Sequence, residues 1–404
     1  MADVASDWRA LDLPVHRGKA GWEFTELGKF DLASFPKADG TTGDGSKVEV
    51  PTPVLPTPPG AKVITQVDAT WKAEPTAVAE GPLVMPLSQA VEEHGELVDR
   101  YLGTVVPVED DPFVARNAAE WEGGAFVYVP RNTHLEAPVV LNLIQAQQGT
   151  AANWRVLVVL EEGAQAEVWE QELSAADGLV NVVFELIVGQ NASLRFVSAQ
   201  GLDEKSWVFG RQRARVERDA SLDWVVLGFG SANGKVFQNT ILDGEGATGK
   251  VTGAYVTRNR QHLDFDTTQE HAAANCVSDL AFRGILTGRS SVVWRGMIKV
   301  DEGAQQTDAF QESRNLLLSK KAHADAIPGL EILANDVRCT HAAAVAQIDR
   351  DQLFYLMSRG LPRDQATRLI IDGFLQSLVE RLGDGELHDA VSSALERRLA
   401  ALLD

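Results

Sequence analysis

The chain has 404 residues, 45% of them hydrophobic, and a formal net charge of −20, so it can bury a large core. It contains no stripe of Lys and Arg residues, which argues against a nucleic-acid partner. Two cysteines, no recognisable signal peptide and no apolar stretch of membrane-spanning length lead us to expect a soluble, cytoplasmic protein.

Residues 1–123 are predicted to form a mixed N-terminal region. Within it, residues 38–60 are rich in Gly, Thr and Pro, a composition that predicts an extended linker without a core. Residues 87–104 place apolar side chains along one side and predict a helix. Residues 112–121 predict a second helix, which begins with proline and stops at a Gly-Gly pair.

Residues 124–345 read as short strands that recur with a fixed period. A small turn residue followed by alanine appears at alanine spacings of 28, 28 and 27 residues, and once more 57 residues later. These pairs are Gly163-Ala164, Asn191-Ala192, Asp219-Ala220, Gly246-Ala247 and Gly303-Ala304. Such a period, with strands on every turn, predicts a β-helix core. An ordinary β-sandwich with coincidental turns is the alternative.

Residues 346–404 return to a helical pattern. Asp349 is a suitable N-cap for a helix that ends at Gly360. A second helix over 362–382 has a broad apolar face, and a third spans 386–403. The broad face predicts that the second helix packs on the third and also on the β-core or on a partner protein.

The Gly-rich stretch from Gly228 to Val236 has the composition of a phosphate-binding loop without its pattern. Phe229 stands where that loop needs glycine, and Val236 stands where it needs Ser or Thr. We therefore predict a turn between two strands and no nucleotide site.

A second polar stretch contains His262, Asp264 and Asp266 on one face of a predicted strand, followed by Glu270 and His271. Such a row can bind a metal, but it is more often the solvated face of a strand whose alternate residues face the core. Two neighbouring carboxylates would also suit a β-helix enzyme that acts on polysaccharides.

The two cysteines lie in different settings. Cys276 is predicted to be a core residue, because free cysteine is among the most buried residue types. Cys339 and His341 share one face if their segment is a strand, and a thiol beside an imidazole can bind iron or zinc. Two ligands cannot complete a site, so the others would come from elsewhere in the chain or from another subunit. The alternative is a buried cysteine beside a surface histidine.

At these residues the chain resembles the SufB/SufD family of iron–sulfur cluster assembly proteins, and within it the SufD branch. The matching segments follow the order of the family and extend over most of the chain. They are Trp22–Leu27, Gly124–Pro138, His262–His271, Gly296–Val300, Gln305–Asp308, Arg314–Leu318 and Asp336–His341.

The resemblance implies a right-handed parallel β-helix with helical domains at both ends. It also implies a complex in which the chain pairs with SufB through the β-helix and binds the SufC ATPase through residues 346–404. In that complex the cluster forms at the SufB–SufD interface, where His341 matches the family's interface histidine and Cys339 a neighbouring cysteine.

By the same resemblance the chain would be no enzyme and would hold no permanent cofactor. A transient iron–sulfur cluster or iron would occupy the interface, SufB would supply the catalytic cysteine, and the chain would contribute to iron acquisition. The presence of only two cysteines favours SufD over a SufB-like scaffold acting as a homodimer, which is the alternative within the family. A polysaccharide-active β-helix enzyme is the alternative of another class.

Overall fold

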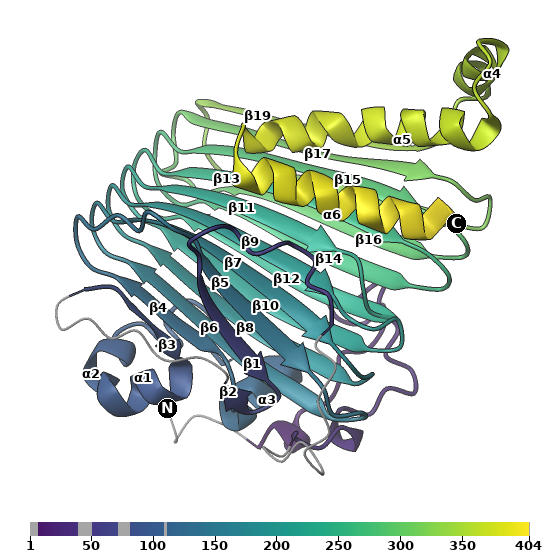
Figure 1. Ribbon diagram of the computed structural model, residues 1–404. Helices are drawn as coiled ribbons and strands as arrows, with labels where there is room; N and C mark the ends of the chain where they lie inside the picture. The colour runs from purple at the N-terminus through teal and green to yellow at the C-terminus, as the bar shows by residue number, and fades with distance from the viewer. Residues whose placement is uncertain (1–6, 39–50, 72–80, 109–110, 404) are drawn as a thin grey trace.

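The computed structural model describes residues 7–38, 51–71, 81–108 and 111–403, and its core is a parallel β-solenoid (Figure 1). Two β-sheets of ten and nine strands face each other, and from β4 on successive strands alternate between the sheets. Apart from two short antiparallel pairs at the start, neighbouring strands within each sheet are parallel, which excludes an ordinary antiparallel sandwich. The predicted mainly β fold with a parallel β-helix core is therefore confirmed.

The ten-stranded sheet is called sheet 1 and the nine-stranded sheet is called sheet 2. Sheet 1 consists of β2 (Thr70–Trp71), β1 (Lys62–Val67), β5 (Val139–Gln145), β7 (Gln165–Ser174), β9 (Ser193–Gly201), β11 (Ser221–Gly228), β13 (Thr248–Thr257), β15 (Val277–Leu286), β17 (Thr307–Leu317) and β19 (Val337–Gln347). Sheet 2 consists of β3 (Leu83–Pro86), β4 (Ala125–Val129), β6 (Ala151–Leu160), β8 (Leu179–Val188), β10 (Trp207–Val216), β12 (Asn233–Leu242), β14 (His262–His271), β16 (Ser291–Val300) and β18 (His323–Ile332). Strands β1 and β3 precede residue 124, so the sheets begin earlier than predicted.

The predicted repeat corresponds to the turns that lead into successive strands of sheet 1. Gly163, Asn191, Asp219 and Gly246 all have positive φ, between 53° and 75°, and the alanine after each of them is buried. The 57-residue gap contains one more repeat, at Asn275, which also has positive φ. The sequence pattern did not reveal it, because Cys276 stands where the other repeats have alanine. Cys276 is fully buried, and its thiol donates to the Gly244 carbonyl at 3.3 Å, which confirms its predicted core role.

Side chains that point between the sheets form columns along the solenoid, because each strand is paired with its neighbour in fixed register. One column runs through sheet 1 as Val139, Val168, Phe196, Trp224, Val251, Leu280, Gln311 and His341. All of its members except His341 are buried. Their burial between the two sheets supplies the main stabilising term of the fold.

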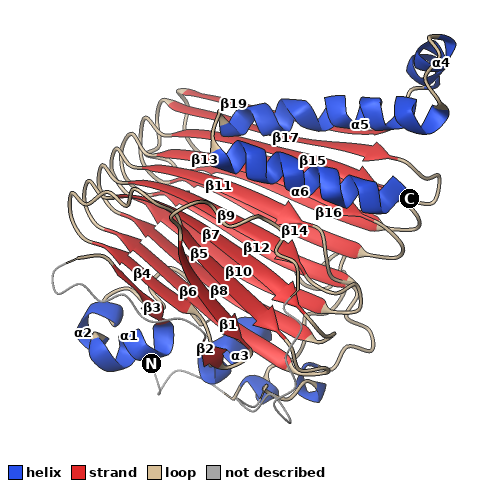
Figure 2. Cartoon of the chain, viewed as in Figure 1, coloured by secondary structure: helices blue, strands red, loops and turns tan. Residues whose placement is uncertain are grey.

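The outer face of sheet 1 is covered by α5 (Arg363–Val379) and α6 (Glu386–Leu403), which lie side by side over it (Figure 2). The apolar face of α5 therefore packs on the β-core. Part of the predicted linker packs here too, since Leu55 is fully buried and its N–H donates to Gln171 Oε1 at 2.7 Å. The expectation that the linker contributes nothing to a core is thus wrong for this residue; residues 39–50 of the segment lie outside the described residues.

The outer face of sheet 2 is covered by the N-terminal residues 7–38 and by three helices. These elements are α1 (Leu87–Glu93), α2 (Gly95–Val98), α3 (Pro112–Glu120) and the short 3-10 turns η1 (Trp8–Ala10) and η2 (Leu32–Ser34). The single helix predicted over 87–104 is divided at His94, next to a glycine that disfavours continuation. The helix predicted over 112–121 is confirmed, and the Asp111 side chain caps its first turn.

The helix α4 (Arg350–Ser358) projects from the body of the molecule beyond the end of β19 (Figure 1). Asp349 caps it as predicted, and Gly360 follows it with a φ of 95°. Only Ile348 and Asp349 separate the last residue of β19 from the first residue of α4. The remaining 3-10 turn, η4 (Glu380–Leu382), joins α5 to the segment that precedes α6. None of the helices that the structure describes combines the length and the apolar content that crossing a membrane would require.

Candidate functional site

The candidate site lies where the solenoid stops. β18 is the last strand of sheet 2 and β19 the last strand of sheet 1, so each has one edge without a neighbour in the described chain. We call this pair of strands the open end. Side chains that would face the interior in an earlier coil face solvent here, and Leu330, Ile332 and Val345 are all more than one-third exposed.

The structure confirms that Cys339 and His341 share one face of a strand. They are paired with Ala309 and Gln311 of β17, both of which are buried and point between the sheets. Cys339 and His341 therefore point toward the interior at the open end.

The two residues differ in accessibility. His341 is exposed, whereas Cys339 is half-buried against a cluster that contains Val300, Ala304 and Ala309. Burial raises the pKa of the Cys339 thiol, and the negative charge of Asp308 raises it further. At neutral pH, Cys339 is consequently a protonated thiol and a weaker metal ligand than a thiolate.

The residue beneath His341 holds a fixed position. The side-chain amide of Gln311 donates to the carbonyls of Gly296 at 3.2 Å and Gly329 at 3.0 Å, which ties β17 across the interior to β16 and β18. Pro328, next to Gly329, is paired with Gly296 in the sheet but has no N–H to donate to the neighbouring strand. The two hydrogen bonds from Gln311 therefore connect the strands at a point where the backbone lacks a donor. Side-chain hydrogen bonds therefore link the two sheets beneath the open end.

Cys339 and His341 alone do not make a metal site. Among the described residues, no group of three or more His, Cys, Asp or Glu side chains is arranged to hold a metal ion. Arg338 of β19 and Asp308 of β17, which are paired in register, form an exposed ion pair on the opposite face of the sheet. Cys339 and His341 could hold iron only with ligands supplied from outside the described chain.

The row from His262 to Asp266 lies in β14 and is not solvated, contrary to the prediction. Leu263 and Phe265 face the core as expected, but Asp264 is only 2% exposed beneath the N-terminal segment. Its carboxylate is bound by Lys235 Nζ at 2.8 Å and by the Thr25 hydroxyl at 2.6 Å. The sequence could not show that residues 7–38 return across this strand.

The other members of that row have structural partners as well. His262 bonds Ser291 Oγ at 2.8 Å, Glu270 pairs with Lys299 at 2.7 Å, and Arg295 lies 3.7 Å from Asp266. His271 points to the opposite, inner face, where burial lowers its pKa to about 4. The row is a buried electrostatic contact between the N-terminal segment and sheet 2, and Asp264 is not accessible for acid–base chemistry on a sugar.

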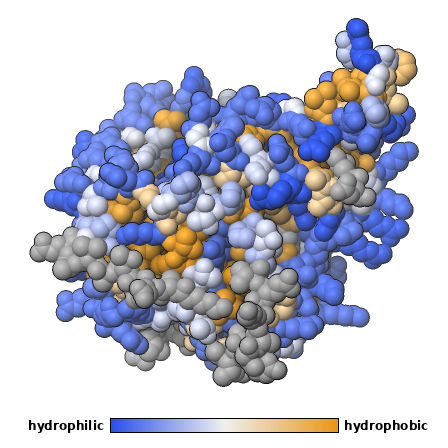
Figure 3. All heavy atoms as spheres, in the orientation of Figure 1, coloured by the Kyte–Doolittle hydropathy of each residue, from blue (hydrophilic) through white to orange (hydrophobic). Residues whose placement is uncertain are grey.

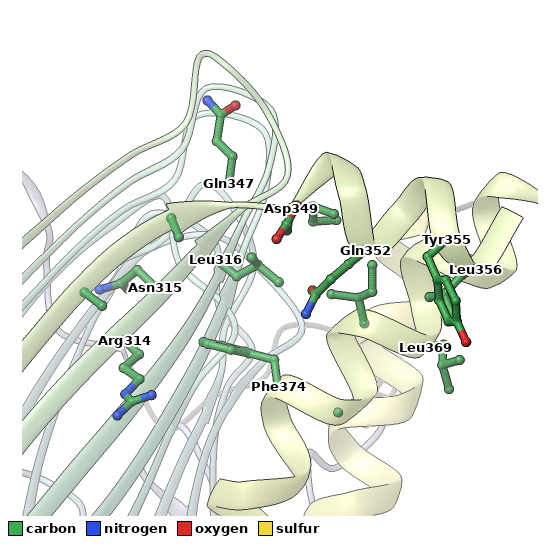
Figure 4. A pocket seen from close by; sticks show the side chains of 15 residues that line it. Arg314, Asn315, Leu316, Gln347, Asp349, Gln352, Tyr355, Leu356, Leu369 and Phe374 are labelled. Carbon is green, nitrogen blue, oxygen red and sulfur yellow. The ribbon is translucent and has the colours of Figure 1, made fainter. Parts of the chain in front are cut away.

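A second surface feature lies within residues 346–404, the segment expected to bind a partner, although no groove was predicted there. A groove of about 710 Å³ lies between β17, β19 and the helices α4 and α5, and most of the side chains that Figure 4 shows around it are apolar. Leu316, Leu356 and Phe374 line it from three different elements. Beside it, Phe354 and Tyr355 of α4 are 72% and 55% exposed. Figure 3 shows hydrophobic side chains gathered where α4 meets α5.

Besides the broad apolar face of the helix predicted over 362–382, the sequence signal for this groove is the apolar run Leu353-Phe-Tyr-Leu-Met357 within α4. Such a run exceeds what one contact face of a short helix can bury. A large exposed apolar patch of this kind marks an interaction surface.

Comparisons with known proteins identify the family to which the chain is similar. A family model described as SUF system FeS cluster assembly, SufBD core domain, matches residues 142–374, and a model of the SufBD N-terminal region matches residues 61–141. The iron–sulfur cluster assembly protein SufD of Bacillus subtilis is 33% identical over 326 residues, which cover 79% of this chain and 74% of the relative. SufBD family proteins of Staphylococcus saprophyticus and Staphylococcus epidermidis are 29% and 28% identical over 306 residues, 75% of this chain and 66% of each relative.

Proposed function

The chain belongs to the SufB/SufD family of iron–sulfur cluster assembly proteins, and from this premise we propose that it is the SufD-type subunit of an assembly scaffold. In this proposal it pairs with a SufB-type partner through the open end and binds a SufC-type ATPase through residues 346–404. It has no turnover of its own and works in a reducing compartment, where its two thiols stay free.

The open end is the observation that supports this proposal. An unpaired strand edge is a template for pairing with another chain, and β18 and β19 present two such edges side by side. A partner solenoid docked there would cover the exposed side chains of Leu330, Ile332 and Val345. It would also bring its own ligands to the face that carries His341 and Cys339.

The chemistry of the pair fits iron and sulfur as transient substrates. A neutral imidazole and a thiolate are both good iron ligands. His341 is exposed and can bind without rearrangement, whereas Cys339 must lose its proton first. We assign His341 the main role and Cys339 a secondary one, with the remaining ligands and the sulfur-accepting cysteine supplied by the partner.

The apolar groove supports the proposed ATPase docking. It lies on the outer side of β17 and β19, whereas His341 lies on the inner side of β19. An ATPase bound to α4 and α5 would therefore leave the open end free for the SufB-type partner.

The assembly role is tested by anaerobic reconstitution with SufB, SufC, iron and sulfide. We expect His341→Ala to lower the cluster yield severalfold, because the interface loses its accessible imidazole. The matched control is His323→Ala, since His323 is also exposed at the open end but bonds Asp325 on the outer face. Equal cluster yields from wild type and His341→Ala would refute the role assigned to His341.

The docking role is tested by co-purification with a SufC-type ATPase. Replacing Phe354 by Ser should abolish retention of the ATPase while retention of SufB is unchanged. The control is Val15→Ser, which removes a side chain of similar exposure at the other end of the chain. Undiminished ATPase binding by Phe354→Ser would contradict the proposed surface.

A further inference from the structure

Cations from three successive turns form a row along one edge of the solenoid. Arg260 lies in the turn between β13 and β14, Arg289 in the turn between β15 and β16, and Lys321 in the turn between β17 and β18. Each of them precedes the first residue of a sheet 2 strand by two positions, and those first residues are paired in register. All three side chains are exposed. We call these three residues the basic ridge.

Hydrogen bonds between the turns hold the row in place. The Arg289 N–H donates to the Asn259 carbonyl at 2.7 Å, and the Ser319 hydroxyl donates to the Gly288 carbonyl at 2.8 Å, so the three turns stack on one another. Figure 1 shows the loops that follow β13, β15 and β17 along one edge of the solenoid. Because neighbouring strands lie about 4.8 Å apart, the backbone positions of the three cations span about 10 Å.

Charges stacked elsewhere on the solenoid alternate in sign. On the outer face of sheet 1, four charged residues follow one another in register, namely Glu167, Arg195, Asp223 and Lys250. Arg195 lies 3.9 Å from Glu167 and 3.2 Å from Asp223, and Lys250 lies 3.9 Å from Asp223. Each cation of that row therefore has an acid beside it, an arrangement that stabilises neighbouring strands.

The basic ridge has no such acids. Among the residues that the structure describes, no carboxylate forms an ion pair with Arg260, Arg289 or Lys321. Glu204, which reaches this edge from an earlier turn, is already bound by Arg258 at 2.5 Å. Like charges stacked in register repel one another, and here they are maintained in a chain with a formal net charge of −20. A row of cations without internal partners favours an anionic ligand from outside the chain.

We propose that the basic ridge binds a short acidic segment of another protein, whose carboxylates contact Arg260, Arg289 and Lys321. A guanidinium group matches a carboxylate with two parallel hydrogen bonds, so the two arginines suit this ligand. An extended segment with acidic residues at alternate positions presents carboxylates about 6.8 Å apart on one face. Long cationic side chains on adjacent turns can spread to meet that spacing.

The small size of the basic ridge favours a short segment over a nucleic acid or an anionic membrane. At physiological ionic strength, exposed charges interact over about 8 Å, so a ligand no longer than the ridge meets mainly its cations. A longer polyanion would extend over the rest of a strongly acidic chain and be repelled. The sequence shows no stripe of Lys and Arg, because the row forms only when three separate turns come together.

The basic ridge is independent of the proposed cluster assembly. Lys321 lies two residues before β18, the last strand of sheet 2, so the ridge ends beside the open end. It shares no residue with the face that carries His341 and Cys339. A segment bound to the ridge would leave that face uncovered, and the test of the ridge requires neither iron nor a SufB-type partner.

The basic ridge is tested with a fluorescein-labelled octapeptide that carries glutamate at alternate positions. Fluorescence anisotropy should show that it binds the full wild-type chain, more weakly as NaCl is added. The triple variant Arg260→Ser/Arg289→Ser/Lys321→Ser should weaken this binding by about tenfold or more, because three charge-assisted contacts are lost. Thermal unfolding checks that the variant is folded, and the removal of stacked like charges should not lower the unfolding temperature.

The matched control is the triple variant Lys37→Ser/Arg131→Ser/Arg218→Ser. It removes the same number of exposed cations, each of which already has its own acid, and should bind the peptide as the wild type does. An equal loss in this control would reduce the effect to net charge and overturn the proposal.

Two further results would overturn the docking of an acidic segment. One is a wild-type chain that does not bind the peptide. The other is competition in which inorganic phosphate or a single-stranded oligonucleotide displaces the peptide at equal or lower concentration, since the ridge would then be a general anion site or a nucleic-acid site. If the triple variant does not fold, Arg289→Ser removes the middle cation alone, and unchanged peptide affinity in that variant would also reject the proposal.

Discussion

Trp224 and His341 occupy the same column of the solenoid interior but lie in very different surroundings. Trp224 is 0% exposed and packs edge-on against Phe196, with ring centroids 5.8 Å apart. His341 is exposed, because no strand of the described chain pairs with the outer edge of β19. The backbone position is equivalent, so the environment is set by whether another coil is present. In a closed coil such a position serves packing; in the last coil it is available for chemistry.

The largest contrast should appear when members of this column are truncated. Trp224→Ala should lower the free energy of unfolding by about 3–5 kcal/mol, because it leaves a cavity between the sheets. His341→Ala should change it by less than about 0.5 kcal/mol. Urea denaturation of both variants measures the difference. Similar losses in the two variants would mean that the open end is packed in solution.

Ion pairs provide the next comparison between closed coils and the open end. Arg155→Met leaves Glu185 buried without its cation and should cost about 3–5 kcal/mol. Arg338→Met removes the exposed partner of Asp308 and should have no measurable effect on stability. The same denaturation assay applies, and a large loss in Arg338→Met would contradict the view of this pair as a surface contact.

A smaller effect concerns the pH dependence of stability, which involves Glu170 and Glu172, two buried acids of β7. Burial raises the pKa of Glu172 from its ordinary 4.5 to about 8, and burial beside Glu172 raises the pKa of Glu170 as well. Between pH 4.5 and about 8, Glu172 keeps its proton in the folded chain but has lost it in the unfolded chain. The contribution of this proton to the free energy of unfolding is therefore complete below pH 4.5 and is lost as the pH rises toward 8.

Glu172→Gln should therefore be less sensitive to pH than the wild type, by up to about 1.4 kcal/mol per pH unit within that window. Thermal unfolding of both chains at several pH values measures this difference. Glu167→Gln should follow the wild-type curve, because its side chain faces outward. Parallel curves for wild type and Glu172→Gln would show that the pair does not titrate in this range.

The smallest contrast is between the two thiols. Cys339 should react with a thiol reagent in the native chain, though more slowly than free cysteine, because its pKa is raised. Cys276 is fully buried and should react only after unfolding. Timed absorbance measurements count the reactive thiols. Addition of a SufB-type partner should slow the reaction of Cys339. Equal reaction rates for Cys339 and Cys276 in the native chain would contradict the buried position of Cys276.

Much of the solenoid could be predicted from the sequence because its turns impose strict local demands. A residue with positive φ followed by a small buried residue leaves a visible period, and helix caps such as Asp349 and Gly360 obey equally local rules. The period was incomplete at Cys276 only because a cysteine fills the position that alanine takes elsewhere.

The candidate site was harder to predict because it depends on what is missing around it. The period of a strand places Cys339 and His341 on one face, but exposure follows from the absence of another coil. The buried state of Asp264 depends on a contact with Thr25, 239 residues away in the chain, which no local pattern reveals. Glu170 and Glu172 escaped notice because acidic residues in a strand normally indicate its solvent face.

The two residues between β19 and α4 act as a mechanical link between the two exposed surfaces. β19 carries His341, and α4 carries the exposed side chains of Phe354, Tyr355 and Met357. With only Ile348 and Asp349 between them, and with the Asp349 side chain fixed to the first turn of α4, there is little slack to absorb a movement. A rotation of α4 would therefore act on β19, the last strand of sheet 1.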